Sequence, residues 1–98
     1  MLTKSEALEI VSKRLQQMST SADPFVVVEK STVEKPFGWV FFYNSKKFLE
    51  TGEYRHRLAG NGPVIVNKHN GSVEFFGASR PPLEIVAEYE QKLAGGIP

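Results

Sequence analysis

The stretch Pro36–Pro63 reads PFGWVFFYNSKKFLETGEYRHRLAGNGP, and the rest of the chain is arranged around it. It opens with the most apolar run of the sequence, residues 39–43, which we interpret as a β-strand. Because side chains alternate along a strand, one face carries Trp39, Phe41 and Tyr43, and the other carries Val40 and Phe42. Two apolar faces indicate a central strand covered on both sides, or one face left open for a partner. We expect the face with the tryptophan to form the core, since large apolar residues are usually inside.

Two amphipathic helices are expected, one near each end of the sequence. Thr3 and Glu6 have the spacing of a helix capping box, and apolar residues follow them three or four positions apart. This first stripe is Ala7, Leu8, Val11, Leu15 and Met18. The last helix is expected to begin at Pro81–Pro82, because first-turn amides have no helical partner, and to end at Gly95. Its stripe is Leu83, Val86, Tyr89 and Leu93.

Four strands and one insertion complete the expected fold. Residues 25–34, 39–43, 64–66 and 73–76 read as strands, and Asn70–Gly71 supplies the positive backbone angles of a hairpin turn. Between strands 2 and 3, an insertion is expected to be irregular or to form a short helix that Ser45 caps and Gly52 ends. The predicted fold class is therefore α+β, with a four-stranded antiparallel sheet flanked by an N-terminal and a C-terminal helix. We expect both helices on one face of the sheet and the other face partly open.

The composition is that of an ordinary globular chain, and we expect residues 1–98 to form a single domain. The net charge is +1, so long-range attraction to nucleic acid or to an acidic membrane is expected to be weak. The absence of cysteine excludes disulfides, thiolate metal sites and a cysteine nucleophile. The first residues lack the apolar core of a signal peptide, and no apolar run approaches the roughly 20 residues that span a bilayer. We therefore expect a cytoplasmic protein.

No group of residues predicts catalysis or a metal site. Histidine is the commonest general base near neutral pH, but His56 lies between two arginines and His69 at a hairpin tip, and both are interpreted as exposed loop residues. The two histidines lack metal-ligand spacing, and Glu88 and Glu90 point to different faces of a helix. Residues 60–62 lack the sequence of a phosphate-binding loop and are interpreted as a turn. We expect no enzyme, no cofactor and no metal.

Charge is unevenly distributed along the chain. Residues 46–57 carry four basic and two acidic side chains, a net charge of +2, whereas residues 82–98 carry one basic and three acidic side chains, a net charge of −2. Nucleic-acid binding needs a denser basic face with base-stacking aromatics, so nucleic acid is not expected as a partner. A protein with an acidic groove is the better partner for residues 46–57, and a plain solvated loop is the alternative.

Several motifs, taken in order, resemble one family. They are GWVFFY at residues 38–43, FLETG at 48–52, LAGNGP at 58–63 and GASRPPLE at 77–84, followed by Tyr89–Glu90. Over residues 24–98 the chain resembles the YrhB-like family, also called the immunity protein 35 family. Its hairpin departs slightly from the family pattern at Asn67 and Asn70, where both replacements still suit a turn.

This resemblance implies a small cytoplasmic α+β protein of bacteria without catalytic activity. Many family members are identified as immunity proteins that bind and neutralise a toxin encoded beside them, and the YrhB branch is identified as heat-stable and chaperone-like. The shared positions are largely apolar or glycine-rich, and we interpret them as structural. They include Gly38, Trp39, Gly60, Asn61, Pro63 and Gly71. The resemblance supplies no catalytic residue and leaves the oligomeric state open.

We therefore expect a non-enzymatic protein that binds a cognate toxin through exposed charged and aromatic side chains of the insertion and of the hairpin tip. These residues are Lys46, Lys47, Glu53, Tyr54, Arg55, Arg57, Lys68 and His69. Tyr54 is the expected anchor, because aromatic residues hold interfaces that charged rims steer together. Two alternatives remain: a chaperone-like holdase that uses apolar surface on the open sheet face, and a small hydrolase or ligand-binding domain with convergent polar groups in a pocket.

Overall fold

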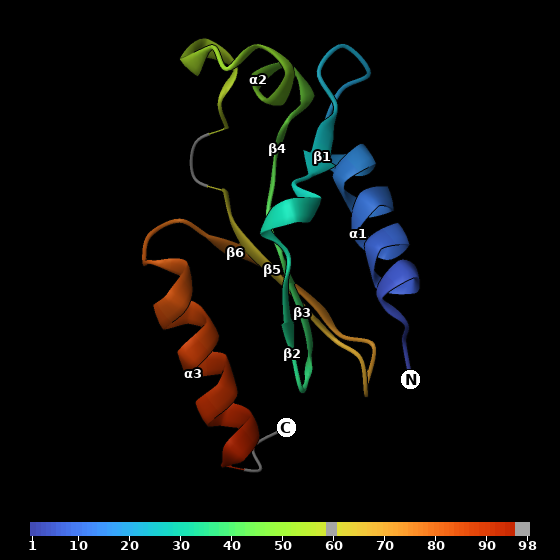
Figure 1. The fold of residues 1–98 in the computed structure, drawn as a ribbon, viewed down its shortest axis with the longest axis vertical. Coiled ribbons are helices and arrows are strands. Elements are labelled where there is room, and N and C mark those ends of the chain that lie inside the picture. Colours follow the sequence, from blue (N-terminus) through green and yellow to red (C-terminus); the bar gives the residue numbers. More distant parts are fainter. Residues whose placement is uncertain (59–60, 96–98) are drawn as a thin grey trace.

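The computed structural model describes residues 1–58 and 61–95, and within them the fold is α+β with antiparallel sheets (Figure 1). The larger sheet has the strand order β2 (Val33–Lys35), β3 (Gly38–Phe41), β5 (Asn61–Asn67) and β6 (Val73–Gly77). The smaller sheet pairs β1 (Phe25–Val27) with β4 (Tyr43–Ser45). The predicted fold class and the four-stranded antiparallel sheet are confirmed.

The expected strands 25–34 and 39–43 are each divided in two, which the sequence analysis did not predict. Phe25 pairs with Ser45 and Val33 with Val40, so eight steps along one strand correspond to five along its partner. The three extra residues form a short 3₁₀ helix, η1 (Glu29–Ser31). An insertion of this kind bends a hairpin as a bulge does. It separates the pair β1–β4 from the larger sheet.

Helix α1 (Lys4–Met18) covers one face of the larger sheet and begins with the predicted capping box of Thr3 and Glu6. Its residues Ala7, Val11 and Leu15 are fully buried. They pack against Trp39, Phe41, Tyr43, Val64 and Val66. The expectation that the tryptophan face forms core is therefore confirmed.

Helix α3 (Pro82–Ala94) covers the opposite face, so the expectation of both helices on one face is wrong. Its residues Ile85 and Val86 pack against Phe37, Val40 and Ile65. Strands β3 and β5 are apolar on both faces, and each face needs a cover to remove it from water. The expected apolar stripe of this helix is also wrong at Leu83, which is 84% exposed. Ile85, which was not part of the expected stripe, is only 4% exposed and belongs to the core.

Gly38 shows why β3 can lie close to β5. Its φ of +150° falls in a region that residues with a side chain rarely adopt, and a Cβ atom there would meet the Val66 carbonyl oxygen at 2.0 Å. Asn61 donates from Nδ2 to the Tyr43 carbonyl at 2.7 Å, and Pro63 is buried. Gly60 lies outside the described residues.

The β5–β6 turn is partly as predicted. Gly71 has a positive φ of 74°, but the described residues include no non-glycine residue with positive φ, so Asn70 does not share that role. Instead the buried Asn67 side chain holds the turn, accepting hydrogen bonds from the amides of His69 at 2.9 Å and Asn70 at 3.2 Å. This is the local side-chain turn for which asparagine is suited.

The molecule is elongated, with extents of 42 × 27 × 21 Å. Helix α2 (Lys46–Thr51) and the 3₁₀ helix η2 (Tyr54–His56) lie at one end of the long axis, at the top of Figure 1. The first residue, the last turn of α3 and the β5–β6 turn lie toward the other end.

Candidate partner-binding surface

The insertion between β4 and β5, which we call the α2–η2 segment (residues 46–57), has the short helix that the sequence predicted. Ser45 Oγ accepts a hydrogen bond from the Phe48 amide at 3.0 Å, which satisfies a first-turn donor. At the other end, Gly52 adopts the left-handed conformation with φ 72°, and its amide donates to the Phe48 carbonyl at 2.7 Å. The segment is therefore held at both ends of its helix.

Asn44 and Asp23 anchor this segment to the smaller sheet. Asn44 Oδ1 accepts from the amides of Ser45 at 2.9 Å and Leu58 at 3.0 Å, which closes the loop at its two ends. Asp23 Oδ1 accepts from the Lys47 amide at 3.4 Å. Asn44 was not among the residues predicted from the sequence; its signal there is a polar residue directly after an apolar strand and before a helix cap.

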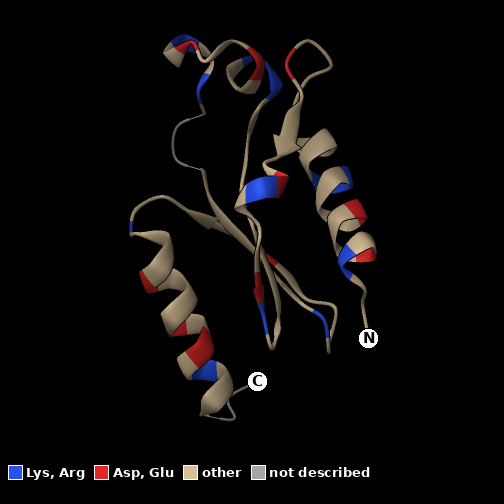
Figure 2. Ribbon diagram, in the orientation of Figure 1, with Lys and Arg blue, Asp and Glu red and all other residues tan. Residues whose placement is uncertain are grey.

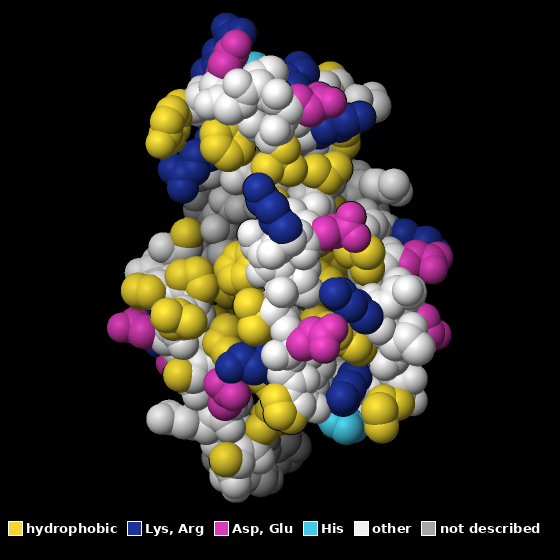
Figure 3. Space-filling view, viewed as in Figure 1, with side chains coloured by type: hydrophobic (Ala, Val, Ile, Leu, Met, Phe, Trp, Pro, Cys, Tyr) yellow, Lys and Arg dark blue, Asp and Glu magenta, His cyan; other side chains and the backbone are white. Residues whose placement is uncertain are grey.

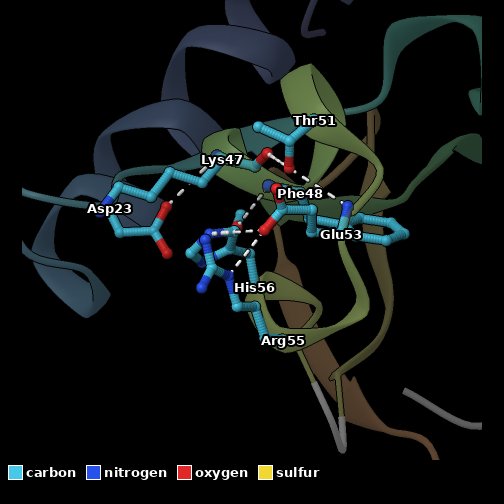
Figure 4. A network of polar contacts seen from close by, with 8 residues as sticks. Asp23, Lys47, Phe48, Thr51, Glu53, Arg55 and His56 are labelled. Carbon is cyan, nitrogen blue, oxygen red and sulfur yellow. Dashed lines mark hydrogen bonds and ion pairs between the residues drawn. The ribbon is translucent and has the colours of Figure 1, made fainter.

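Glu53 is the centre of a polar network on the segment (Figure 4). Its Oε2 atom lies 2.6 Å from Arg55 Nε and 3.8 Å from His56 Nε2. The Glu53 amide donates to Thr51 Oγ1 at 3.2 Å, and that hydroxyl donates to the Lys47 carbonyl at 2.7 Å. The carboxylate is already bound to a guanidinium, so this network orders the surface side chains.

Tyr54 is the most exposed aromatic side chain described, at 80%. Its ring lies 6.3 Å from the Phe48 ring, and the Arg57 guanidinium lies 5.9 Å from its centroid. A cation over an aromatic face is weakly attractive at an exposed site. No residue of α2 or η2 is buried. The ring therefore contacts its neighbours on one side while most of its surface is exposed to solvent.

Basic side chains gather at this end of the molecule, as Figures 2 and 3 show. Arg55 is bound to Glu53, whereas Lys46, Lys47 and Arg57 make no ion pair with any other described residue. Unpaired cations of this kind raise the local positive potential and attract acidic surfaces. The acidic side chains of α3 lie away from this end (Figure 2).

The structure divides the predicted partner-binding residues into two groups. Six of them lie together on the α2–η2 segment: Lys46, Lys47, Glu53, Tyr54, Arg55 and Arg57. Lys68 and His69 lie on the β5–β6 turn, toward the opposite end (Figure 1). The Lys68 backbone is used there for packing, since its amide donates to Phe37 O at 2.8 Å and its carbonyl accepts from Leu2 N at 2.9 Å. One compact interface cannot include both groups.

Neither histidine lies in an enclosed site. His69 is exposed, with Nε2 3.4 Å from the Pro36 carbonyl oxygen. His56 keeps 24% of its side-chain surface accessible and shares Glu53 with Arg55. Among the described residues, no three His, Asp or Glu side chains converge as metal ligands would. In the same part of the chain, none of the helices has the length and apolar character needed to cross a membrane.

These features define the class: a small α+β protein that presents a charged, aromatic surface at one end of a covered sheet. The chain belongs to the immunity protein 35 family, whose sequence profile matches residues 5–92. It is similar to the uncharacterized protein YrhB of Escherichia coli (strain K12), with 42% identity over 62 residues. That match covers 62% of this chain and 66% of the relative, just under two thirds of its length. No solved structure gives a significant match.

Proposed function

We propose that this protein is a bacterial immunity protein that binds a cognate toxin and neutralises it by covering the toxin's active site or substrate-binding surface, with no catalysis of its own. Membership of the immunity protein 35 family supports the proposal. The observation that carries it is the exposed Tyr54 ring among unpaired cations on a segment with no buried residue.

The chemistry of the α2–η2 segment indicates how binding would proceed. Lys46, Lys47 and Arg57 steer an acidic surface of the toxin toward this end, which raises the association rate. Tyr54 then becomes buried, and a large rigid aromatic ring contributes much of the binding energy at the centre of an interface. The polar network around Glu53 holds the neighbouring side chains in place, so less side-chain entropy is lost on binding.

The test replaces Tyr54 and Arg55 with alanine and measures binding to the toxin candidate encoded in the neighbouring reading frame. We expect affinity to fall by at least about tenfold, the size of an interface anchor, with an unchanged melting temperature. The matched control changes Lys68 and His69 to alanine at the opposite end and is expected to leave affinity unchanged. Unchanged affinity of the Tyr54 and Arg55 variant in calorimetry contradicts the proposal, as does failure of the protein to rescue cells that express the toxin.

A general holdase role depended on an open apolar sheet face. In the described residues, α1 covers one face of the larger sheet and α3 covers the other, so that motivation is removed. Selective binding is therefore the proposed activity. Suppression of aggregation of several unrelated client proteins, at the concentration that binds the toxin, would contradict it.

A further inference from the structure

Strand β6 is an unpaired edge of the larger sheet. It has five residues, Val73–Gly77, and within the described chain its only hydrogen-bonded neighbour is β5. In an antiparallel sheet, alternate residues direct their N–H and C=O groups to one neighbour and the intervening residues direct theirs to the other side. The outer side of β6 therefore presents main-chain groups that a further extended chain can pair with.

The opposite edge, β2, is protected in ways that β6 is not. Strand β2 has three residues, and ion pairs join it to both helices, Glu34 to Lys4 at 3.8 Å and Lys35 to Glu90 at 3.6 Å. Short length and charged side chains are common devices that prevent an edge from pairing with other chains. Strand β6 is longer, carries neither lysine nor proline, and has a single charged side chain, Glu74. The fold therefore leaves one edge available.

A groove of about 400 Å³ lies beside this edge, between β6 and α3. Its apolar lining includes Phe76 from β6 and Ile85 and Tyr89 from α3. Glu74 also lines it, two residues from Phe76 and therefore on the same face of β6. A chain added to β6 would direct alternate side chains into this groove, one beside Glu74 and the next beside Phe76.

The carboxylate of Glu74 on β6 favours a basic side chain in the added chain. Arg80 and Glu88 are bound to each other, and this hydrogen bond raises the pKa of Arg80 and lowers that of Glu88. Glu74 makes no ion pair with any described residue. The lining also holds Lys92, so two acidic and two basic side chains balance in the groove, and Glu74 is the charged one that lies on β6 itself, next to an added chain. A lysine or arginine beside Glu74 would complete the missing ion pair.

We propose that β6 and α3 form a strand-addition site for an extended segment of another protein, one that presents an apolar residue and a lysine or arginine two positions apart. Main-chain hydrogen bonds to β6 supply affinity, and the groove selects the two side chains. This site lies on a different surface from the α2–η2 segment and does not depend on toxin binding there.

The probe is a short synthetic peptide in which valine and lysine alternate along one face and threonine fills the other. We expect it to bind with chemical-shift changes at β6 and α3, about fivefold to tenfold more tightly than the same peptide with glutamate for lysine. A version methylated on the backbone nitrogens that would pair with β6 is expected to lose binding, because it keeps every side chain but cannot extend the sheet.

Two variants of the full chain locate the selectivity. Glu74→Lys is expected to abolish or reverse the preference for the lysine peptide. Glu84→Lys makes the same charge change at an exposed position of α3 outside the groove, and it is expected to keep the preference. Equal binding of the lysine and glutamate peptides, or of the methylated peptide, overturns the proposal. So does concentration-dependent dimerisation through β6 that excludes the peptide in sedimentation experiments, because a second copy would then be the occupant.

Discussion

The larger sheet and the α2–η2 segment use aromatic side chains in opposite ways. In β3, Trp39 is 7% exposed and Phe41 is 1% exposed, and both pack against α1. On the α2–η2 segment, Tyr54 is 80% exposed and no helical residue is buried. Stability and the proposed partner contact therefore fall on separate stretches of the chain. Substitutions in one region are expected to leave the property of the other largely unchanged.

The largest expected difference is in the free energy of unfolding, when one phenylalanine from each region is replaced by alanine. Phe41→Ala removes a fully buried ring and is expected to cost about 3–5 kcal/mol of the free energy of unfolding, since the core cannot fill the cavity. Phe48→Ala, on the half-buried face of α2, is expected to cost less than about 1.5 kcal/mol. Urea unfolding of both variants measures the difference. Similar costs would mean that the α2–η2 segment contributes to the core after all.

A smaller loss in the free energy of unfolding is expected when the N-terminal caps of α1 and α2 are replaced. Thr3 caps α1, which carries core residues, and Ser45 caps α2, which carries none. Alanine at either position is expected to cost about 1 kcal/mol, because a first-turn amide loses its acceptor. Only Ser45→Ala is expected also to weaken toxin binding. A binding loss of equal size for Thr3→Ala would show that the two regions are coupled.

The smallest effect is expected from a comparison of one tyrosine in each region, Tyr43 and Tyr54, and it appears only at alkaline pH. Burial raises the pKa of Tyr43 above its ordinary value of 10.0, so the folded state favours the neutral phenol. Because the pKa of Tyr43 is raised in the folded state, the contribution of its neutral phenol to the free energy of unfolding is fully present below about pH 10. That contribution is lost as pH rises through the folded-state pKa.

Tyr43→Phe is therefore expected to flatten the alkaline loss of the free energy of unfolding, measured by denaturant titration from about pH 8 to about pH 11. Tyr54→Phe is the matched control in the exposed region and is expected to keep the loss. Identical profiles for wild type and Tyr43→Phe would place the alkaline transition elsewhere in the fold.

Local patterns predicted the parts of the fold that depend on neighbours in sequence. Alternation along β3 assigned the faces of Trp39 and Val40, and cap and stop signals assigned α2 between Ser45 and Gly52. The same patterns could not show that α1 and α3 lie on opposite faces of the larger sheet. The face on which a helix packs depends on the path of the whole chain segment that connects the helix to its strand. The two apolar faces of β3 agreed with a cover on each side, but they agreed equally with one face left open for a partner.

Two other features depended on contacts between distant residues. The 3₁₀ helix η1 is one of them, because the three residues it adds are known only from the pairing registers of β1 with β4 and of β2 with β3. Leu83 and Ile85 are both apolar residues in the first turns of α3, and packing against the sheet decides which one is buried. For the candidate surface, the sequence identified Tyr54 and its basic neighbours, but it joined them to Lys68 and His69, which the fold places far away.

The positions of the first residue and of the last turn of α3 have a practical consequence for measuring the two surfaces separately. Both lie away from the α2–η2 segment (Figure 1), so a label or chip linker placed beyond either of them leaves Tyr54 accessible. Lys92 and Leu93 line the groove beside β6, so a linker placed after α3 would crowd it, whereas one placed before α1 would not. Immobilising the same protein in these two orientations distinguishes ligands of one surface from ligands of the other without any mutation.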